Sequence, residues 1–514
     1  MATLSLALPT ARSSTAIVIP RKTDALFFSH DDLNAHVIQF QQKLARLGIG
    51  PKSAVSIALP NSYEFIVAFL ATTRQRAIAA PLNPAYKQDE FDFYIDDLRS
   101  AVVLVPRDFH SQNGPAIRAA RKHQAAIAEC FWDGRDVVLD VKDPGKLANR
   151  RREDLCEARP NDIALVLHTS GTTGRPKAVP LTHLNLTTTM RNIKATYQLS
   201  PEDRTYLVMP LFHVHGLLAG FLAPLHSEGS VIAPARFSAS EFWADFTTYK
   251  ANWYTAVPTI HQILLRSPLP SKLPVIRFIR SCSSPLSPQT FHDLEKAFSA
   301  PVVEAYAMTE GAHQMTSNPL PPLKRYPGSV GIGWGVDVKI LDQDGNGVPQ
   351  GSEGEICIRG ENVTKGYLNN PEANRSSFTA KGFFKTGDQG IQDQNGYIVI
   401  TGRIKEIINK GGEKISPVEI DNVITRHPAV AEAVTFAIPD DMYGQDVGVA
   451  VVLHEGAWAS KDELRQWMAT KMAKFKVAKQ IYFAKIMPKT ATGKVQRRKV
   501  ADAMLEAERT KAKL

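Results

Sequence analysis

Short apolar runs alternate with amphipathic stretches through the first part of the chain. The run at 54–59 is followed by Asn61 and Ser62, either of which can cap a helix, and then by a second apolar run at 77–82. A third run at 101–105 follows another amphipathic stretch. Strands that alternate with helices in this way form parallel sheets with right-handed crossovers. The pattern therefore predicts an α/β fold built on a parallel sheet.

Four later apolar runs end in polar, small or histidine residues instead of ordinary turn sequences. They lie at 205–210, 253–258, 275–279 and 302–306. Ligands of open α/β sheets bind outside the carboxyl ends of the strands. We therefore expect the residues that follow these runs to line one shared cleft.

The pattern changes from about residue 328 to short strands separated by Gly, Asp and Asn turns. This texture predicts an antiparallel or barrel-like piece. From about residue 406 the chain has further strands and an amphipathic helix that begins near Asp462. This last part is long enough to form a small separate domain.

Composition places the chain among ordinary globular proteins, with 44% hydrophobic and 22% charged residues in 514. No apolar run approaches the ~20 residues that span a bilayer. The net charge of +10 favours anionic ligands, and a nucleic-acid partner is disfavoured because no RNA-binding motif with stacking aromatics is present. The cysteines lack CxxC spacing, which argues against a disulfide framework or a zinc site and favours a reducing compartment. They are Cys130, Cys156, Cys282 and Cys357.

A polar loop between apolar runs at 163–167 and 178–181 is the clearest candidate for chemistry. Its glycines let the backbone pass close to a ligand, while N–H groups, hydroxyls and two cations supply donors and positive charge. We expect a polyphosphate site, although not a P-loop, because no Gly-Lys-Ser/Thr sequence leads into a helix. The alternative is a solvated hairpin. The loop consists of Thr169, Ser170, Gly171, Thr172, Thr173, Gly174, Arg175, Pro176 and Lys177.

Five motifs, in this order, resemble those of the adenylate-forming acyl-CoA synthetase superfamily, which includes luciferase and the adenylation domains of peptide synthetases. The resemblance implies a large domain of parallel α/β sheets plus a barrel-like piece over residues 1–402. It also implies a smaller, mobile α+β domain over 406–514, with a hinge near 403–405. The motifs lie at 169–177, 306–310, 385–388, 402–417 and 488–494.

Within the superfamily, several strings resemble the oxalate–CoA ligase (peroxisomal-CoA-synthetase-like) group of plants and fungi. The implied reaction converts oxalate, ATP and CoA to oxalyl-CoA, AMP and diphosphate through an acyl-adenylate. One basic helix follows residue 494, so we expect no carrier domain and CoA as the acceptor. The alternatives are a CoA ligase for another short- or medium-chain or aromatic acid in a fungal-type specialised pathway, and a non-catalytic basic RNA- or anion-binding protein. The strings are 210–218, 253–261, 280–283 and 305–310 with His313.

The resemblance assigns roles in an ATP site. The loop at 169–177 would hold the β- and γ-phosphates, and Thr309 would donate to the α-phosphate. Glu310 would hold Mg²⁺, a hard cation that takes oxygen ligands. Asp388 would accept both ribose hydroxyls, and Arg403 would support the ribose and phosphate. The other expected ATP- and AMP-binding residues are Ser283, Ser284, Ala305 and Tyr306, with Tyr306 against the adenine.

The resemblance also assigns the second half-reaction. Lys494 would reach the reacting carboxylate and the α-phosphate oxygens, since a flexible ammonium on a late loop can move in and out. Lys405 would be the hinge, whose rotation withdraws Lys494 and brings in Gly411 and Gly412 for CoA.

The acid pocket is expected to be lined by two histidines of one apolar run, a serine and a third histidine. On a strand, His213 and His215 would share one face, which also invites a metal site, but the sequence offers no third ligand. A carboxylate beside these rings would favour the imidazolium form. The pocket residues are His213, His215, Ser283 and His313.

The chain ends in Ala512, Lys513 and Leu514, which resemble the Ser-Lys-Leu peroxisomal address. The expected partner is then the peroxisomal import receptor, and the expected location is the peroxisome, with the cytoplasm second. The alternative is a frayed helix end.

Overall fold

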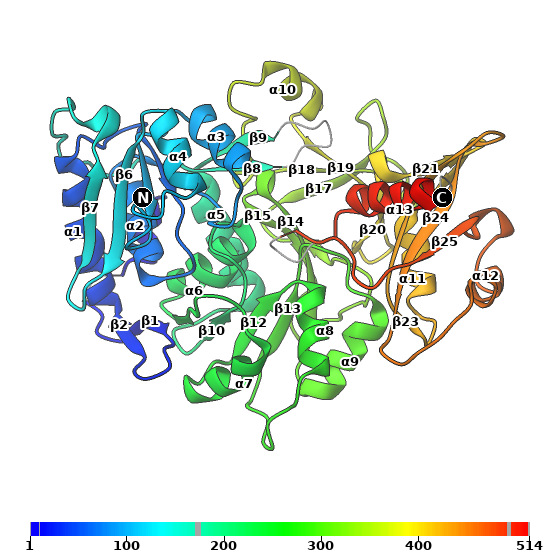
Figure 1. The fold of residues 1–514 in the computed structure, drawn as a ribbon. Coiled ribbons are helices and arrows are strands. Elements are labelled where there is room, and N and C mark those ends of the chain that lie inside the picture. The colour runs from blue at the N-terminus through cyan, green and yellow to red at the C-terminus, as the bar shows by residue number, and fades with distance from the viewer. Residues whose placement is uncertain (1, 10, 170–175, 491–494, 512–514) are drawn as a thin grey trace.

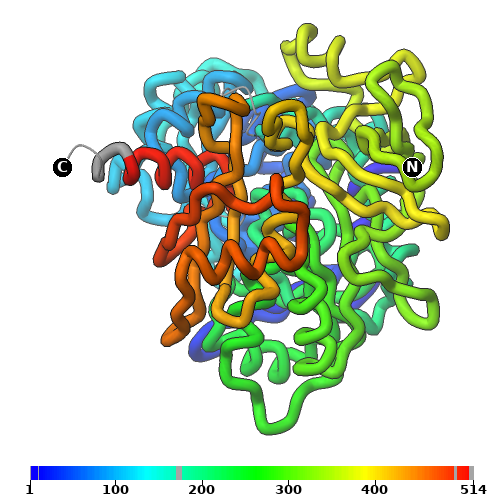
Figure 2. The backbone as a smooth tube through the Cα atoms, turned by 90° about the vertical axis from the view of Figure 1, so that its right-hand side faces the viewer, coloured from blue at the N-terminus to red at the C-terminus, as the bar shows by residue number. Residues whose placement is uncertain are grey.

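Four β-sheets organise the chain in the computed structural model, which describes residues 2–9, 11–169, 176–490 and 495–511. The blue to yellow part of the chain carries three of the sheets, and the orange and red part carries the fourth (Figure 1). Turned by 90°, the orange and red part faces the viewer (Figure 2). Among the helices described, none has the length and apolar character that crossing a membrane requires.

The first sheet has seven strands in the order β7-β6-β5-β3-β4-β8-β9. Its central neighbours are parallel, as predicted, and the two edge strands β7 and β9 run antiparallel to β6 and β8. The polar loop therefore joins an antiparallel hairpin at one edge. The strands are β3 (Ala54–Ile57), β4 (Ile78–Pro81), β5 (Val102–Val105), β6 (Ala126–Trp132), β7 (Val137–Asp143), β8 (Ile163–Thr169) and β9 (Lys177–Thr182).

Local sequence determines how the helices of this region begin. The Ser62 hydroxyl accepts from the backbone N–H of Phe65 and caps α2. Asn61 instead binds backbone groups of Met209 and Leu211 and so links this sheet to the next one. The helices are η1 (Leu4–Ala7), α1 (His30–Arg46), α2 (Tyr63–Arg74), α3 (Gln88–Asp97), α4 (Pro115–Lys122), η2 (Gly145–Leu147) and α5 (His183–Tyr197).

The second sheet has nine strands in the order β16-β15-β14-β13-β12-β10-β11-β1-β2. Strands β14, β13, β12 and β10 are parallel neighbours, so their carboxyl ends meet at one edge, as the predicted shared cleft requires. The strands are β1 (Thr15–Ile19), β2 (Leu26–Ser29), β10 (Arg204–Leu207), β11 (Ser230–Ile232), β12 (Trp253–Ala256), β13 (Phe278–Ser281), β14 (Val302–Met308), β15 (His313–Ser317) and β16 (Ile332–Gly333).

The predicted strand at 275–279 begins three residues too early and ends two residues too early, because β13 covers Phe278–Ser281. Val275 is 88% exposed, whereas all four residues of β13 are buried, including Arg280. The strand therefore contains a buried cation, Arg280, that lies beyond the predicted apolar run. The helices of this region are η3 (His215–Leu222), α6 (Ala223–His226), α7 (Ala239–Thr248), α8 (Pro258–Arg266), α9 (Pro288–Phe298) and η4 (Thr309–Gly311).

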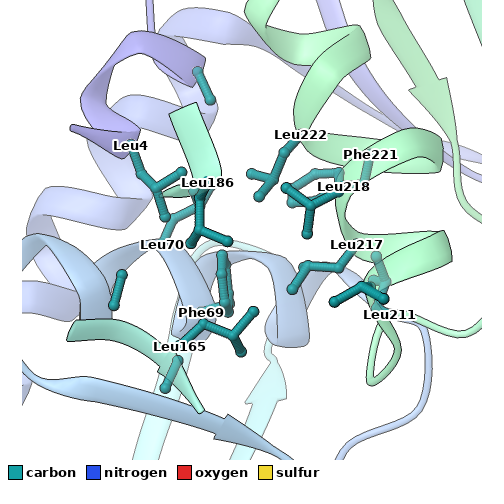
Figure 3. Close-up of a cluster of buried hydrophobic side chains, with 14 of the residues drawn as sticks. Leu4, Phe69, Leu70, Leu165, Leu186, Leu211, Leu217, Leu218, Phe221 and Leu222 are labelled. Carbon is teal, nitrogen blue, oxygen red and sulfur yellow. The ribbon is translucent and has the colours of Figure 1, made fainter. Parts of the chain in front are cut away.

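A hydrophobic core anchors η3, a π-helix, between the two large sheets (Figure 3). Because every residue of η3 is buried, its first residue, His215, has a fixed position at the edge of this core. The labelled side chains of this core are Leu4, Phe69, Leu70, Leu165, Leu186, Leu211, Leu217, Leu218, Phe221 and Leu222.

The piece after residue 328 is an antiparallel sheet in the order β17-β18-β19-β20, as the turn-rich sequence predicted. Its strands are β17 (Asp337–Leu341), β18 (Gly354–Arg359), β19 (Phe384–Gln392) and β20 (Ile398–Arg403), with α10 (Pro371–Ser377) between β18 and β19.

The last sheet, formed by β21 to β25, has mixed pairing and its own hydrophobic core. Its elements are η5 (Ile404–Glu406), β21 (Ile408–Lys410), β22 (Glu413–Ile415), α11 (Pro417–Ile424), β23 (Val430–Asp440), β24 (Gly444–Leu453), α12 (Lys461–Ala469), η6 (Lys474–Lys476), β25 (Gln480–Phe483) and α13 (Arg497–Lys511).

Candidate active site

The polar hairpin begins and ends in a regular strand pair. Thr169, the last residue of β8, pairs with Lys177, the first residue of β9. The ammonium of Lys177 lies 4.7 Å from the centre of the Tyr367 ring. Lys177 is thereby held beside the next element of the site, described below. The predicted phosphate-binding residues Ser170, Gly171, Thr172, Thr173 and Gly174 lie outside the described residues.

Glu310 is a buried carboxylate in the turn that follows β14. It is 6% exposed, and its Oε1 accepts a hydrogen bond of 2.9 Å from the Tyr367 hydroxyl. Burial raises the pKa of Glu310 above its ordinary value, and the Tyr367 hydrogen bond opposes this shift. Asn362, from the segment after β18, holds this turn in place, because its side chain donates to the Gly311 carbonyl at 2.8 Å. A buried carboxylate whose side-chain hydrogen-bond donor is neutral fits a hard divalent cation, since the cation would add to the positive charge that Arg403 and Lys177 direct at Glu310.

The sequence motifs assign no role to Tyr367. The sequence feature that could have indicated it is the aromatic residue in the Lys365-Gly366-Tyr367 string. Its hydrogen-bond partner, Glu310, lies 57 residues away in the sequence. Tyr367 contacts both Lys177 of the hairpin, through its ring, and Glu310, through its hydroxyl. Two predicted site residues therefore contact the same tyrosine.

Asp388 and Arg403 face each other on the neighbouring strands β19 and β20. Arg403 Nε donates to Asp388 Oδ1 at 2.8 Å, and the Tyr306 hydroxyl donates to Asp388 Oδ2 at 2.5 Å. Burial, followed by the charge of Asp388, raises the pKa of Tyr306 well above its ordinary value, so Tyr306 stays a donor. Each carboxylate oxygen has a second lone pair, which leaves Asp388 able to accept from a diol.

The remaining nucleotide-site predictions lie at the carboxyl ends of β13 and β14. Ala305 is a buried residue of β14, and Thr309 begins η4 directly after that strand. Ser283 and Ser284 follow β13 and are half-buried. Because β13 and β14 are parallel neighbours, these residues lie at the same edge of the sheet.

The acid-pocket predictions also converge. His215 Nδ1 lies 3.0 Å from Ser283 Oγ, and the ring of His215 stacks on that of His313 with centroids 5.2 Å apart. His213 Nδ1 accepts from the His215 backbone N–H at 3.2 Å. Both ring nitrogens of His313 are buried without a protein partner among the described residues.

The prediction that His213 and His215 lie on a strand is wrong. His213 lies in a bend, and His215 is the first residue of the π-helix η3. The reason is close packing at Gly216, where a Cβ would lie 2.2 Å from the Pro210 carbonyl oxygen. The chain turns back at that point because glycine permits this approach.

His215 and His313 are neutral before any acid binds. Burial, and next the positive charge of Arg280, lower the pKa of His215 and of His313 well below the ordinary histidine value. The sequence motifs assign no role to Arg280, which follows directly after the apolar run at 275–279. The cluster therefore contains a fixed cation and neutral hydrogen-bond donors.

The hinge and CoA predictions lie next to each other in the fourth sheet. Lys405 is in η5, and Gly411 and Gly412 form the two-residue turn between β21 and β22, with φ of 58° and 100°. Positive φ at both positions suits glycine in a tight hairpin. Arg497 donates to Glu406 at 2.9 Å, which ties α13 to η5. Lys494 lies outside the described residues.

Comparison with known proteins assigns the family. The sequence profile of the AMP-binding enzyme family matches residues 11–368, and that of the AMP-binding enzyme C-terminal domain matches residues 419–494. The oxalate–CoA ligase of Saccharomyces cerevisiae is 46% identical, over 98% of this chain and 96% of the relative. The oxalate–CoA ligase of Arabidopsis thaliana is 49% identical, over 89% of this chain and 90% of the relative. The ATP-bound structure of MatB from Rhodopseudomonas palustris superposes with a TM-score of 0.88 at 29% identity, over 98% of this chain and 99% of that one. The chain belongs to the AMP-binding enzyme family.

Proposed function

We propose that this AMP-binding enzyme is an ATP-dependent acid–CoA ligase that converts oxalate to oxalyl-CoA through an oxalyl-adenylate. The observation that carries the choice of oxalate is the buried polar cluster of His215, His313 and Arg280. A second carboxylate needs donors and positive charge, whereas burying an unpaired charge costs several kcal/mol in a pocket for hydrocarbon. The two oxalate–CoA ligases that resemble the chain over most of their length support the same substrate.

The first half-reaction needs positioned charge rather than an enzyme nucleophile. One oxalate carboxylate attacks the α-phosphorus of ATP, and pyrophosphate leaves. The hairpin from Thr169 to Lys177 binds the β- and γ-phosphates, and Thr309 donates to the α-phosphate. Asp388 binds the ribose hydroxyls, with Arg403 beside it. The adenine lies along Tyr306, Ala305, Ser283 and Ser284.

Glu310 is the proposed ligand of Mg²⁺. A bound Mg²⁺ neutralises charge on phosphate oxygens. The buried Glu310 carboxylate fits this cation because its described side-chain partner is the neutral Tyr367 hydroxyl. Tyr367 orients the carboxylate, and Asn362 fixes the turn that carries it.

The second half-reaction displaces AMP with the thiolate of CoA. We propose that the C-terminal domain, residues 406–514, rotates about a hinge near 403–405 that includes Lys405. This motion withdraws Lys494 and brings the turn of Gly411 and Gly412 to the CoA channel. The contact between Arg497 and Glu406 supports the proposal that Lys494 moves with the hinge. It links α13, the helix that follows Lys494, to the residue directly after Lys405.

Pyrophosphate release with a panel of acids tests the substrate. Oxalate is expected to give the highest kcat/KM, above acetate, a medium-chain fatty acid and an aromatic acid, because these acids leave the buried cluster without a second carboxylate. The thioester product is checked by chromatography with CoA present. A higher kcat/KM for a medium-chain or aromatic acid would contradict the assignment of oxalate, and no pyrophosphate release with any acid would contradict the ligase itself.

The location remains a prediction, since Ala512, Lys513 and Leu514 lie outside the described residues. A fluorescent protein followed by the last residues of this chain is expected to enter peroxisomes, through the import receptor that reads such tripeptides. The same fusion without the tripeptide is expected in the cytosol. An identical distribution of the two fusions would refute the address.

A further inference from the structure

Arg280 is a buried cation whose partners are all neutral. It is 0% exposed on the central strand β13, and its guanidinium donates to the Tyr197 hydroxyl at 2.7 Å, to Thr255 Oγ1 at 3.0 Å and to Gln314 Oε1 at 3.2 Å. One of its nitrogens also lies 3.4 Å from His215 Nε2. Within the described residues, no carboxylate forms an ion pair with it. A buried charge without a counter-ion is unfavourable for folding, so its presence calls for another explanation.

Thr255 connects this cation to the acid pocket. Arginine has no acceptor, so Thr255 Oγ1 must accept from Arg280 Nη1. The hydroxyl proton of Thr255 is then directed to His215 Nε2, which lies 2.6 Å away. His215 is held neutral by burial and by the charge of Arg280, so it carries one ring proton. We assign this proton to Nδ1 from the hydrogen-bond pattern.

The opposite tautomer of His215 fits these contacts less well. A proton on Nε2 would face the N–H groups of Arg280, 3.4 Å away, and would leave the Thr255 proton without that acceptor. With the proton on Nδ1, His215 donates to Ser283 Oγ at 3.0 Å. The Ser283 hydroxyl then points its own proton away from His215. Ser283 is half-buried at the carboxyl end of β13, the edge at which the site residues gather.

We propose that Arg280, Thr255 and His215 form a polarised hydrogen-bond relay that holds the Ser283 hydroxyl as a donor to the second carboxylate of the acid. Arg280 and Thr255 are positioning residues of this relay, because they act through His215 and Ser283. The relay rests on the proposed function only in placing the acid beside Ser283. Hydrogen bonds in such chains polarise one another, and the charge of Arg280 adds to the attraction of an anion. The relay therefore selects dianionic over monoanionic short acids.

Thr255→Val tests the relay with almost no change in side-chain volume. The variant is expected to raise the KM for oxalate about tenfold, the effect of weakening one hydrogen bond to a charged group, and to leave the KM for ATP within twofold. Thr255→Ser keeps the hydroxyl and is expected to restore the KM for oxalate. Arg280→Met is expected to lower the ratio of kcat/KM for oxalate to that for acetate by at least the same factor.

A matched control is Thr205→Val. Thr205 is a buried threonine on β10, the strand next to β12, which carries Thr255. Its hydroxyl has no hydrogen-bond partner among the described residues. This variant is expected to leave both KM values unchanged. Melting temperatures of all variants separate a change in stability from a change in acid binding.

A double-mutant cycle with Ser283→Ala decides the mechanism. If Thr255 acts through Ser283, Thr255→Val adds little to the oxalate KM of the Ser283→Ala variant. Additive effects, or a Thr255→Ser variant that does not restore the KM, would overturn the relay. If the wild-type enzyme prefers a different dicarboxylic acid, the proposed substrate fails, and the same cycle with that acid still decides the relay: non-additive effects support it and additive effects overturn it. A preference for a monocarboxylic acid would overturn both.

Discussion

Lys494→Ala is expected to slow adenylate formation by roughly 10²–10³-fold and to leave thioester formation from preformed acyl-adenylate near the wild-type rate. The loss of one preorganised donor to the charge that develops at the reacting centre typically costs about 3–4 kcal/mol, which gives this factor. In the proposed mechanism the hinge motion withdraws Lys494 before CoA reacts, so the second half-reaction does not need it. Pyrophosphate release measures the first step, and conversion of purified oxalyl-adenylate to oxalyl-CoA measures the second.

The control for Lys494 is Lys499→Ala, which removes an exposed lysine of α13 close in sequence. Both half-reactions of this variant are expected to match the wild type. If the Lys494 variant loses both half-reactions to the same degree, one arrangement of the active site serves both steps, and the proposed role of the hinge is wrong.

The sequence was sufficient to predict features that depend on neighbouring residues. Apolar runs at 54–59, 77–82 and 101–105 became β3, β4 and β5, and Ser62 caps the helix between the first two. A cap is a contact over three residues, and a strand pattern repeats every two residues. The convergence of strand ends was also predictable, because parallel topology follows from the alternation of strands and helices.

The environment of Arg280 was not predictable, because its contacts are not local. Its bonds go to Tyr197, 83 residues away in α5, to Thr255, 25 residues away in β12, and to Gln314 in β15. The predicted strand follows the apolar residues at 275–279 and stops before the polar pair Arg280 and Ser281, whereas β13 begins three residues later and includes both. The polar partners of Arg280 come from α5, β12 and β15, which lie next to one another only in the folded protein.

The placement of the histidines also depends on contacts that are not local in sequence. The residue types of His215 and His313 indicated a polar acid pocket, but their placement depends on Gly216 and on the core that buries η3. Proximity of His215 to Ser283, 68 residues apart, was inferred from the family resemblance and is present in the structure. The roles given to these residues in binding the acid remain predictions.

His313→Ala is expected to raise the KM for oxalate about tenfold to hundredfold and to leave the KM for ATP nearly unchanged. His313 is 1% exposed, and neither ring nitrogen has a protein partner among the described residues. His313 stacks on His215 of the proposed acid pocket, so its neutral ring, which has no other hydrogen-bond partner in the described part of the chain, can donate one N–H to a carboxylate. A hydrogen bond to a charged group contributes about 1.5–3 kcal/mol, which corresponds to this range of KM.

Two further variants separate acid binding from backbone strain and from the loss of any buried histidine. His313 has a φ of 93°, a conformation that glycine adopts more easily than alanine, so His313→Gly removes the ring with less strain. Both His313 variants are expected to show the same rise in the oxalate KM. His183 is 1% exposed in α5 and bonded to Leu4 and Thr73, so His183→Ala is expected to lower the melting temperature without changing the oxalate KM. A normal oxalate KM in His313→Gly would show that the ring does not bind the acid, because the glycine variant lacks the imidazole and keeps the backbone.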